Sequence, residues 1–265
     1  EEKEALVQKG YEEVEQVIAQ AAHLKAYQDS EDQLEDLAKL PLLDLADIQV
    51  EAEVPHYTAA LSGEMTVFKT HAFTNGIGYV NYSFNCPAIH SEELPYLSLL
   101  SYLLGKMSTK RTHYTTLAKA INLNTGGLRG SLNIFTPVGK RDQLNLRLEL
   151  KSKAFISKQP VMITLMKEVM TETVFDDYSR LKDLIAELKT RLQTSIPASG
   201  HTSALLRAKA QFSLTARANE WTSGIDFYHF VESLDRDFDF RKEEVRDRLE
   251  SLMETVFNKR QLLIA

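Results

Sequence analysis

The chain opens with apolar residues that recur at roughly helical spacing over residues 1–27, with glutamates between them. A polar break at residues 29–32 precedes a short second helical stretch, which Pro41 closes. We therefore expect an acidic helical hairpin over residues 1–40 that acts as a linker. A separate domain is expected over residues 41–265.

Beyond Pro41 the pattern changes to that of β-strands. Residues 48–54 alternate between apolar and polar, while residues 65–69 and 77–84 are rich in β-branched and aromatic side chains. The clearest strand covers residues 144–151, in which every second residue is leucine. Together with residues 128–136 it predicts a β-hairpin with one covered face and one wet or interfacial face.

Helical periodicity fills the rest of the chain. The predicted helices cover residues 91–105, 115–124, 161–173, 181–192, 204–218, 227–234 and 245–257. Hairpin-linked strands and helices in runs indicate an α+β fold, with a largely antiparallel sheet of about six strands backed by helices. Residues 261–265 look like the start of a strand with no return, so we expect the domain to be truncated there. Such an unpaired strand would present an open edge that invites self-association.

Composition narrows the class of protein. The chain is 43% hydrophobic and 26% charged, which is typical of a folded domain. No run of about 18 apolar residues occurs, so no membrane span is expected. The single cysteine, Cys86, excludes an internal disulfide and is compatible with a reducing compartment. We therefore expect the cytoplasm or an organelle interior rather than secretion.

Charge is distributed unevenly. Residues 1–50 hold 13 acidic and 4 basic side chains, a net charge of −9, so the other residues carry +3 of the total of −6. Residues 106–153 form a basic stretch, and its ten cations are Lys106, Lys110, Arg111, Lys119, Arg129, Lys140, Arg141, Arg147, Lys151 and Lys153. This stretch indicates either a solvated face or a surface for an acidic partner. Nucleic acid is not expected, because stacking aromatics do not interleave the basic residues.

Motifs of known chemistry are incomplete. Residues 90–94 read H-S-E-E-L, with Leu94 where an H-x-x-E-H zinc motif needs its second imidazole. Asp235, Asp237 and Asp239 resemble the start of a calcium loop, but the required glycine and final glutamate are missing. The glycines at 126–130 do not form a phosphate loop, and Cys86 has no signature around it. We therefore expect no catalytic residue and no metal ligand in this chain.

Several segments, in this order, resemble the presequence proteases of the insulinase/pitrilysin family of zinc peptidases. They are residues 40–48 (LPLLDLADI), 74–79 (TNGIGY), 94–105 (LPYLSLLSYLLG), 124–127 (NTGG), 199–201 (SGH) with Arg207, and 221–225 (WTSGI). The acidic stretch before Pro41 is similar to the linker between the two halves of these enzymes. The resemblance places this chain in the C-terminal half, as the linker and the third of four repeated units.

The resemblance implies that the parent protein degrades unfolded peptides with zinc, held by H-x-x-E-H in its first unit, and that this segment needs no cofactor. Ser98, Ser101 and Tyr102 are expected at the positions that correspond to the zinc ligands and the catalytic base, where they would not replace His, Glu and His. The expected partners are the catalytic N-terminal half and peptide substrates. The segment would form a chamber wall and the hinge, with the basic stretch facing the other half or a peptide's carboxylates.

Two other classes remain open from the sequence. One is a non-enzymatic scaffold or interaction module of the same fold, similar to the core subunits of respiratory complexes. The other is an independent enzyme with an unrecognised site. A parent reading frame that carries H-x-x-E-H upstream would favour the peptidase over both.

Overall fold

A computed structural model describes residues 11–48, 56–63, 65–140 and 143–265, with side chains from residue 14 onward. The chain divides into two compact units, residues 1–54 and 55–265. This division falls later than the boundary expected after residue 40. Each unit is described by itself.

The first unit contains α2 (Tyr11–Asp29), the single-turn helix α3 (Leu34–Leu37) and a 3-10 turn at Leu45–Asp47. Side chains 15–48 are all exposed, including large apolar ones such as Leu42 and Leu45. Within residues 14–48, therefore, no apolar packing holds α2 against α3. The hairpin stays a prediction.

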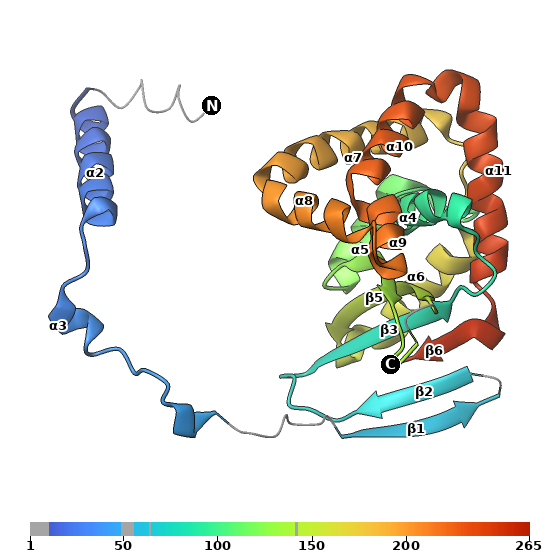
Figure 1. Cartoon of the computed structure of the whole chain (residues 1–265), viewed down its shortest axis with the longest axis horizontal. Coiled ribbons are helices and arrows are strands. Elements are labelled where there is room, and N and C mark those ends of the chain that lie inside the picture. Colours follow the sequence, from blue (N-terminus) through green and yellow to red (C-terminus); the bar gives the residue numbers. More distant parts are fainter. Residues whose placement is uncertain (1–10, 49–55, 64, 141–142) are drawn as a thin grey trace. The chain divides into compact units, whose positions relative to one another are not determined.

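The second unit is built on one six-stranded sheet (Figure 1). Its strands are β1 (Tyr57–Ser62), β2 (Met65–Thr70), β3 (Ile77–Asn85), β4 (Leu128–Phe135), β5 (Asn145–Phe155) and β6 (Leu262–Ile264). They are ordered β1-β2-β6-β3-β5-β4, and all neighbours are antiparallel except β2 and β6. The pattern missed β1, and most of the strand expected at 48–54 lies outside the described residues.

Helices of the second unit gather on one side of this sheet (Figure 1). They are α4 (Leu94–Leu103), α5 (Tyr114–Asn124), α6 (Gln159–Glu172), α7 (Tyr178–Ala198), α8 (Gly200–Lys209), α9 (Leu214–Ser223), α10 (Ile225–Arg236) and α11 (Phe238–Val256). This arrangement confirms the α+β prediction. None of the described helices combines the length and the apolar character needed to cross a bilayer.

One predicted helix, over residues 204–218, was wrong, because the structure has two helices there. The chain turns after Lys209, and the Ser213 side chain then caps α9 by accepting a hydrogen bond from the Ala216 N–H. A serine in this position satisfies one of the free N–H groups at a helix start, which favours a new helix over continuation of the old one.

The core lies between the helices and the sheet. On β5 the side chains of Leu146, Leu148 and Leu150 are buried against the helices, whereas Lys151 and Lys153 on the opposite face are exposed. Burying a leucine side chain contributes about 1.5–3 kcal/mol relative to leaving it exposed. The alternation of residues 144–151 therefore confirms which face of the predicted hairpin is covered.

The last strand differs from expectation. β6 lies inside the sheet, parallel to β2 and antiparallel to β3, and is not an unpaired edge. Ala265 continues the pairing, since its N–H donates to the Asn81 carbonyl oxygen at 2.9 Å and its own carbonyl accepts from the Asn81 N–H at 2.7 Å. The expectation that the last strand is unpaired was therefore wrong.

Candidate functional site

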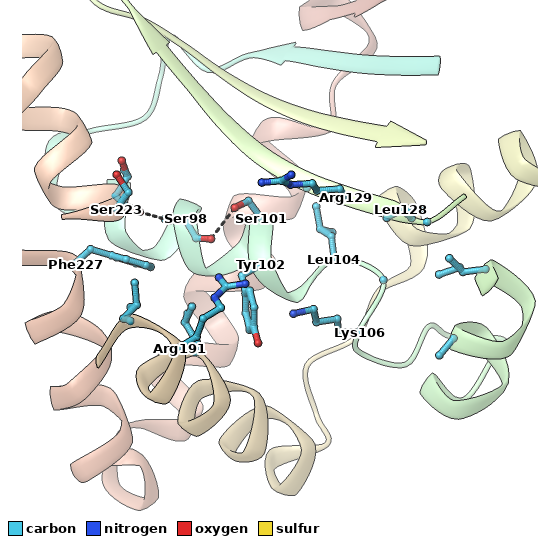
Figure 2. Close-up of a pocket in the computed structure, with 18 of the residues that line it drawn as sticks. Ser98, Ser101, Tyr102, Leu104, Lys106, Leu128, Arg129, Arg191, Ser223 and Phe227 are labelled. Atoms are coloured by element: carbon cyan, nitrogen blue, oxygen red, sulfur yellow. Dashed lines mark hydrogen bonds between the residues drawn. The ribbon is translucent and has the colours of Figure 1, made fainter. Parts of the chain in front are cut away.

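A pocket of about 430 Å³ opens between the helices and strand β4, and we call it the α4 pocket. Its walls come from α4, α5, α7, α9, α10 and β4, together with the loops after α4 and before β4 (Figure 2). Parts of three segments that carry the family resemblance, residues 94–105, 124–127 and 221–225, meet in its lining. This convergence makes it the candidate site.

Ser98, Ser101 and Tyr102 all line the α4 pocket. Their spacing of three and four residues places them on one face of α4, while the leucines at 97, 100 and 103 are buried in the core. The Ser98 hydroxyl donates to the Thr222 carbonyl oxygen at 2.6 Å, and the Ser101 hydroxyl donates to the Ser98 carbonyl oxygen at 2.8 Å (Figure 2). Both hydroxyls thus tie α4 to itself and to α9.

This lining does not suit a zinc ion. It contains no His, Cys, Asp or Glu side chain, and zinc in proteins is held by those groups. Across the described part of the chain, no group of three such residues is placed to hold a metal. The correspondence of Ser98, Ser101 and Tyr102 to the ligand and base positions stays a prediction.

Cations surround Tyr102 on the floor of the pocket. The Lys106 ammonium lies 3.3 Å from the centre of the Tyr102 ring, and the Arg191 guanidinium carbon lies 4.7 Å from the same centre. Such contacts attract a cation to the negative face of the ring. The Tyr102 hydroxyl donates to Glu187 Oε1 at 2.7 Å, and the same oxygen is 3.9 Å from Lys106 Nζ.

Protonation in this cluster is shifted. Burial lowers the pKa of Lys106 to about 8; Glu187 opposes this shift, whereas Arg191 and Arg180 add to it. Burial also raises the pKa of the Tyr102 phenol, and the hydrogen bond to Glu187 raises it further. Tyr102 therefore stays neutral at ordinary pH, and the nearby arginines make Lys106 easier to deprotonate.

Arg129 on β4 is the third cation of the lining, and its guanidinium lies above Ser101 in the view of Figure 2. The structure thus divides the basic stretch. Lys106 and Arg129 border the pocket. Arg129 lies directly opposite Lys151 in the β4–β5 register, so its side chain leaves the edge strand β4 on the same sheet face as those of Arg147 and Lys151, away from the helices. On that face Lys151 pairs with Glu149 at 2.6 Å. Arg141 lies outside the described residues.

Sequence reasoning missed Arg191. It lies on α7, 38 residues beyond the end of the basic stretch, and one helical turn after Glu187. A spacing of four residues places the two side chains on the same face of the helix, but it does not indicate that Arg191 borders a pocket made by other elements.

Two other resemblance residues, Arg207 and Ile225, belong to a junction between helices. Glu220, 2% exposed, accepts a hydrogen bond from Arg207 at 2.9 Å and from the Ile225 N–H at 3.1 Å. Arg207 also pairs with Asp226. These contacts join α8, α9 and the start of α10, so Arg207 and Ile225 of the resemblance segments have a structural role here.

Other candidate groups are dispersed. Asp235, Asp237 and Asp239 pair with three different cations, namely Lys189, Arg236 and Lys182, and two of the three lie within helices. His90 precedes the 3-10 turn Ser91–Glu93, and its N–H donates to Glu93 at 3.0 Å. Burial raises the pKa of Cys86 to about 11, so its thiol is protonated and poorly nucleophilic.

Comparisons with known proteins identify the family to which this chain is related. The model of a peptidase-associated family, described as associated with subfamily C of peptidase family M-16, matches residues 1–234. Protein HypA of Clostridium perfringens is 32% identical over 252 residues, which cover 94% of this chain and 26% of HypA.

Two eukaryotic relatives carry a more specific name. Presequence protease 1 of Arabidopsis thaliana, chloroplastic/mitochondrial, is 25% identical over 91% of this chain and 22% of its own length. The mitochondrial presequence protease of Drosophila melanogaster is 25% identical over 93% of this chain and 23% of its own length. The chain spans about a quarter of these curated relatives. Because the family model matches most of its residues, the chain belongs to this peptidase-associated family, as a segment of the presequence protease type.

Proposed function

We propose that this chain is a non-catalytic segment of a larger zinc-dependent peptidase that degrades unfolded peptides. Within that protein it forms part of the wall of the chamber that encloses the substrate, and the hinge beside it. The observation that carries the proposal is the match to a peptidase-associated family by a chain that spans about a quarter of relatives named presequence protease.

Features of the site support the same role. The face of α4 that borders the pocket carries hydroxyls that are hydrogen-bonded within the fold, and the lining offers no imidazole or carboxylate to a metal. A rigid wall with charged and apolar side chains suits confinement of a peptide, and closure around a substrate excludes water from the reaction. The catalytic N-terminal half of the same protein is the partner that this proposal requires.

A cleavage assay tests the proposal. The purified chain is incubated with zinc and an unstructured peptide of presequence length, and bound zinc is quantified in the same sample. We expect no cleavage and no stoichiometric zinc. Chelator-sensitive cleavage with one zinc per chain would show that the chain contains its own catalytic site.

Comparison of the parent protein with and without this segment separates the peptidase role from a scaffold role. We expect removal of residues 1–265 to abolish peptide cleavage while the catalytic half still binds zinc. If the parent protein cleaves the peptide equally well without the segment, a scaffold or interaction role replaces the proposed one.

A further inference from the structure

The α4 pocket holds more positive than negative charge. Lys106, Arg129 and Arg191 line it, and Glu187, which accepts the Tyr102 hydroxyl, is the carboxylate closest to these cations among the contacts described. Neither Arg129 nor Arg191 forms an ion pair with any side chain in the described ranges. Two guanidinium groups are therefore available to an anion from outside.

The pocket also has an apolar wall. Leu128, Leu188 and Phe227 belong to its lining, and in the view of Figure 2 Phe227 and Arg191 lie toward one end of the hollow, whereas Leu128 and Lys106 lie toward the other. Its volume of about 430 Å³ lies in the range of small-ligand sites, which typically combine apolar walls with a few polar groups that fix orientation. A ligand with one anionic group and one apolar group fits both features.

We propose that the α4 pocket binds a carboxylate group of a peptide through Arg129, Arg191 and Lys106, while an adjacent apolar side chain of that peptide lies against Leu128, which is only partly buried. Guanidinium groups suit this ligand because their planar N–H pairs match the two oxygens of a carboxylate. The choice of a peptide as the carrier rests on the proposed function. The carboxylate is either the C-terminus of the peptide or an Asp or Glu side chain.

Three peptides of equal length distinguish these sources by calorimetric titration of the whole chain. The first is acetyl-Leu-Ala-Phe with a free C-terminus, the second is its C-terminal amide, and the third is acetyl-Leu-Glu-Phe amide. We expect the amide without an acid to bind at least about tenfold more weakly than the better of the other two, since a charge-assisted hydrogen bond is lost. The better binder identifies the source of the carboxylate.

Variants localise the binding. Arg191→Gln is expected to weaken binding of the preferred peptide by about tenfold or more, and Arg129→Gln to act in the same direction. Both residues are exposed, so these changes leave the core intact. Lys167→Gln is the matched control, because Lys167 is an exposed cation on α6 outside the pocket lining, and it should leave affinity unchanged.

Equal affinity for all three peptides, or no binding of any of them, would overturn the proposal. An equal loss in Lys167→Gln and Arg191→Gln would also overturn it, because the effect would then come from net charge. These measurements need neither zinc nor cleavage. If peptide binding persists when the segment is shown to be dispensable for cleavage, only the proposed function fails.

Discussion

At the residue scale, Lys106 is the side chain whose environment differs most from that of an ordinary surface lysine. It lies beside the Tyr102 ring, with Arg191 stacked on the same ring and Arg180 donating to the Lys106 carbonyl oxygen at 3.3 Å. Its pKa of about 8, against 10.5 for a free lysine, reflects burial first; Glu187 opposes the shift, and the two arginines add to it. The sequence marks Lys106 only as one of ten cations in the basic stretch.

This shift predicts the reactivity and the energetics of Lys106. Competitive acetylation followed by mass spectrometry should show Lys106 reacting with a midpoint near pH 8 in the folded chain. In denaturant the midpoint should return to the ordinary lysine value, which provides the control. A folded-state midpoint at the denatured value would contradict the arrangement around Tyr102.

The sign of the accompanying stability change follows from proton binding. Between pH 8 and 10.5 the unfolded chain holds a proton on Lys106 that the folded chain has lost, so the contribution of this residue to the free energy of unfolding rises with pH. Below pH 8 the full cost of the buried charge is present. Lys106→Met should therefore gain stability relative to wild type near neutral pH, and the gain should shrink as pH increases through this window.

At the element scale, the approach of α4 to β4 sets the floor of the pocket. Gly130 on β4 lies directly against the Ser101 carbonyl of α4, so closely that a Cβ at this position would overlap the carbonyl oxygen. The contact requires glycine because of space, since its backbone is not in the left-handed region. The position of Ser98 and Ser101 in the lining depends on this approach.

Gly130→Ala is expected to lower the free energy of unfolding by about 1–3 kcal/mol, because either the helix or the strand must move. Urea denaturation measures the change. Gly200→Ala is the control, since nothing lies within 4 Å of a Cβ there, and it should leave stability unchanged or raise it by up to about 1 kcal/mol. Unaltered stability of Gly130→Ala would show that the two elements are less closely packed.

At the scale of the whole molecule, β6 joins two parts of the sheet. β1 and β2 pair with each other, and β6 connects β2 to β3. A two-stranded hairpin is marginally stable alone in water, so the order of β1 and β2 depends on this short strand. The C-terminal residues thus stabilise a hairpin almost two hundred positions earlier in the chain.

Deletion of residues 262–265 is expected to expose the β1–β2 hairpin. Hydrogen–deuterium exchange should increase by at least about tenfold at residues 65–70, because their ordering loses its link to the core. Amides of α7, which packs against α10, provide the internal control and should keep their protection. Unchanged exchange in β2 would mean that other contacts hold the hairpin.

The local pattern of residues determined most elements of this protein. Strict alternation at 144–151 predicted β5 and its buried face, and helical spacing predicted α4, α5, α6 and α10 within a few residues and the greater part of α7 and α11. The local pattern also predicted the α+β class, because the spacing of apolar residues indicates which segments are strands, which are helices and which side of each is buried. β1 and the division between α8 and α9 were missed, since a short exposed strand and a tight turn give weak periodic signals.

Only the tertiary structure decided which residues meet. Arg191 joins Lys106 at Tyr102 through the packing of α7 beside α4, and the final strand enters the middle of the sheet instead of forming its edge. Neither fact follows from local spacing, because both depend on contacts between segments separated by dozens of residues or more. The sequence by itself therefore determined the elements and the family resemblance, whereas the cationic pocket and the continuous six-stranded sheet arose from long-range packing.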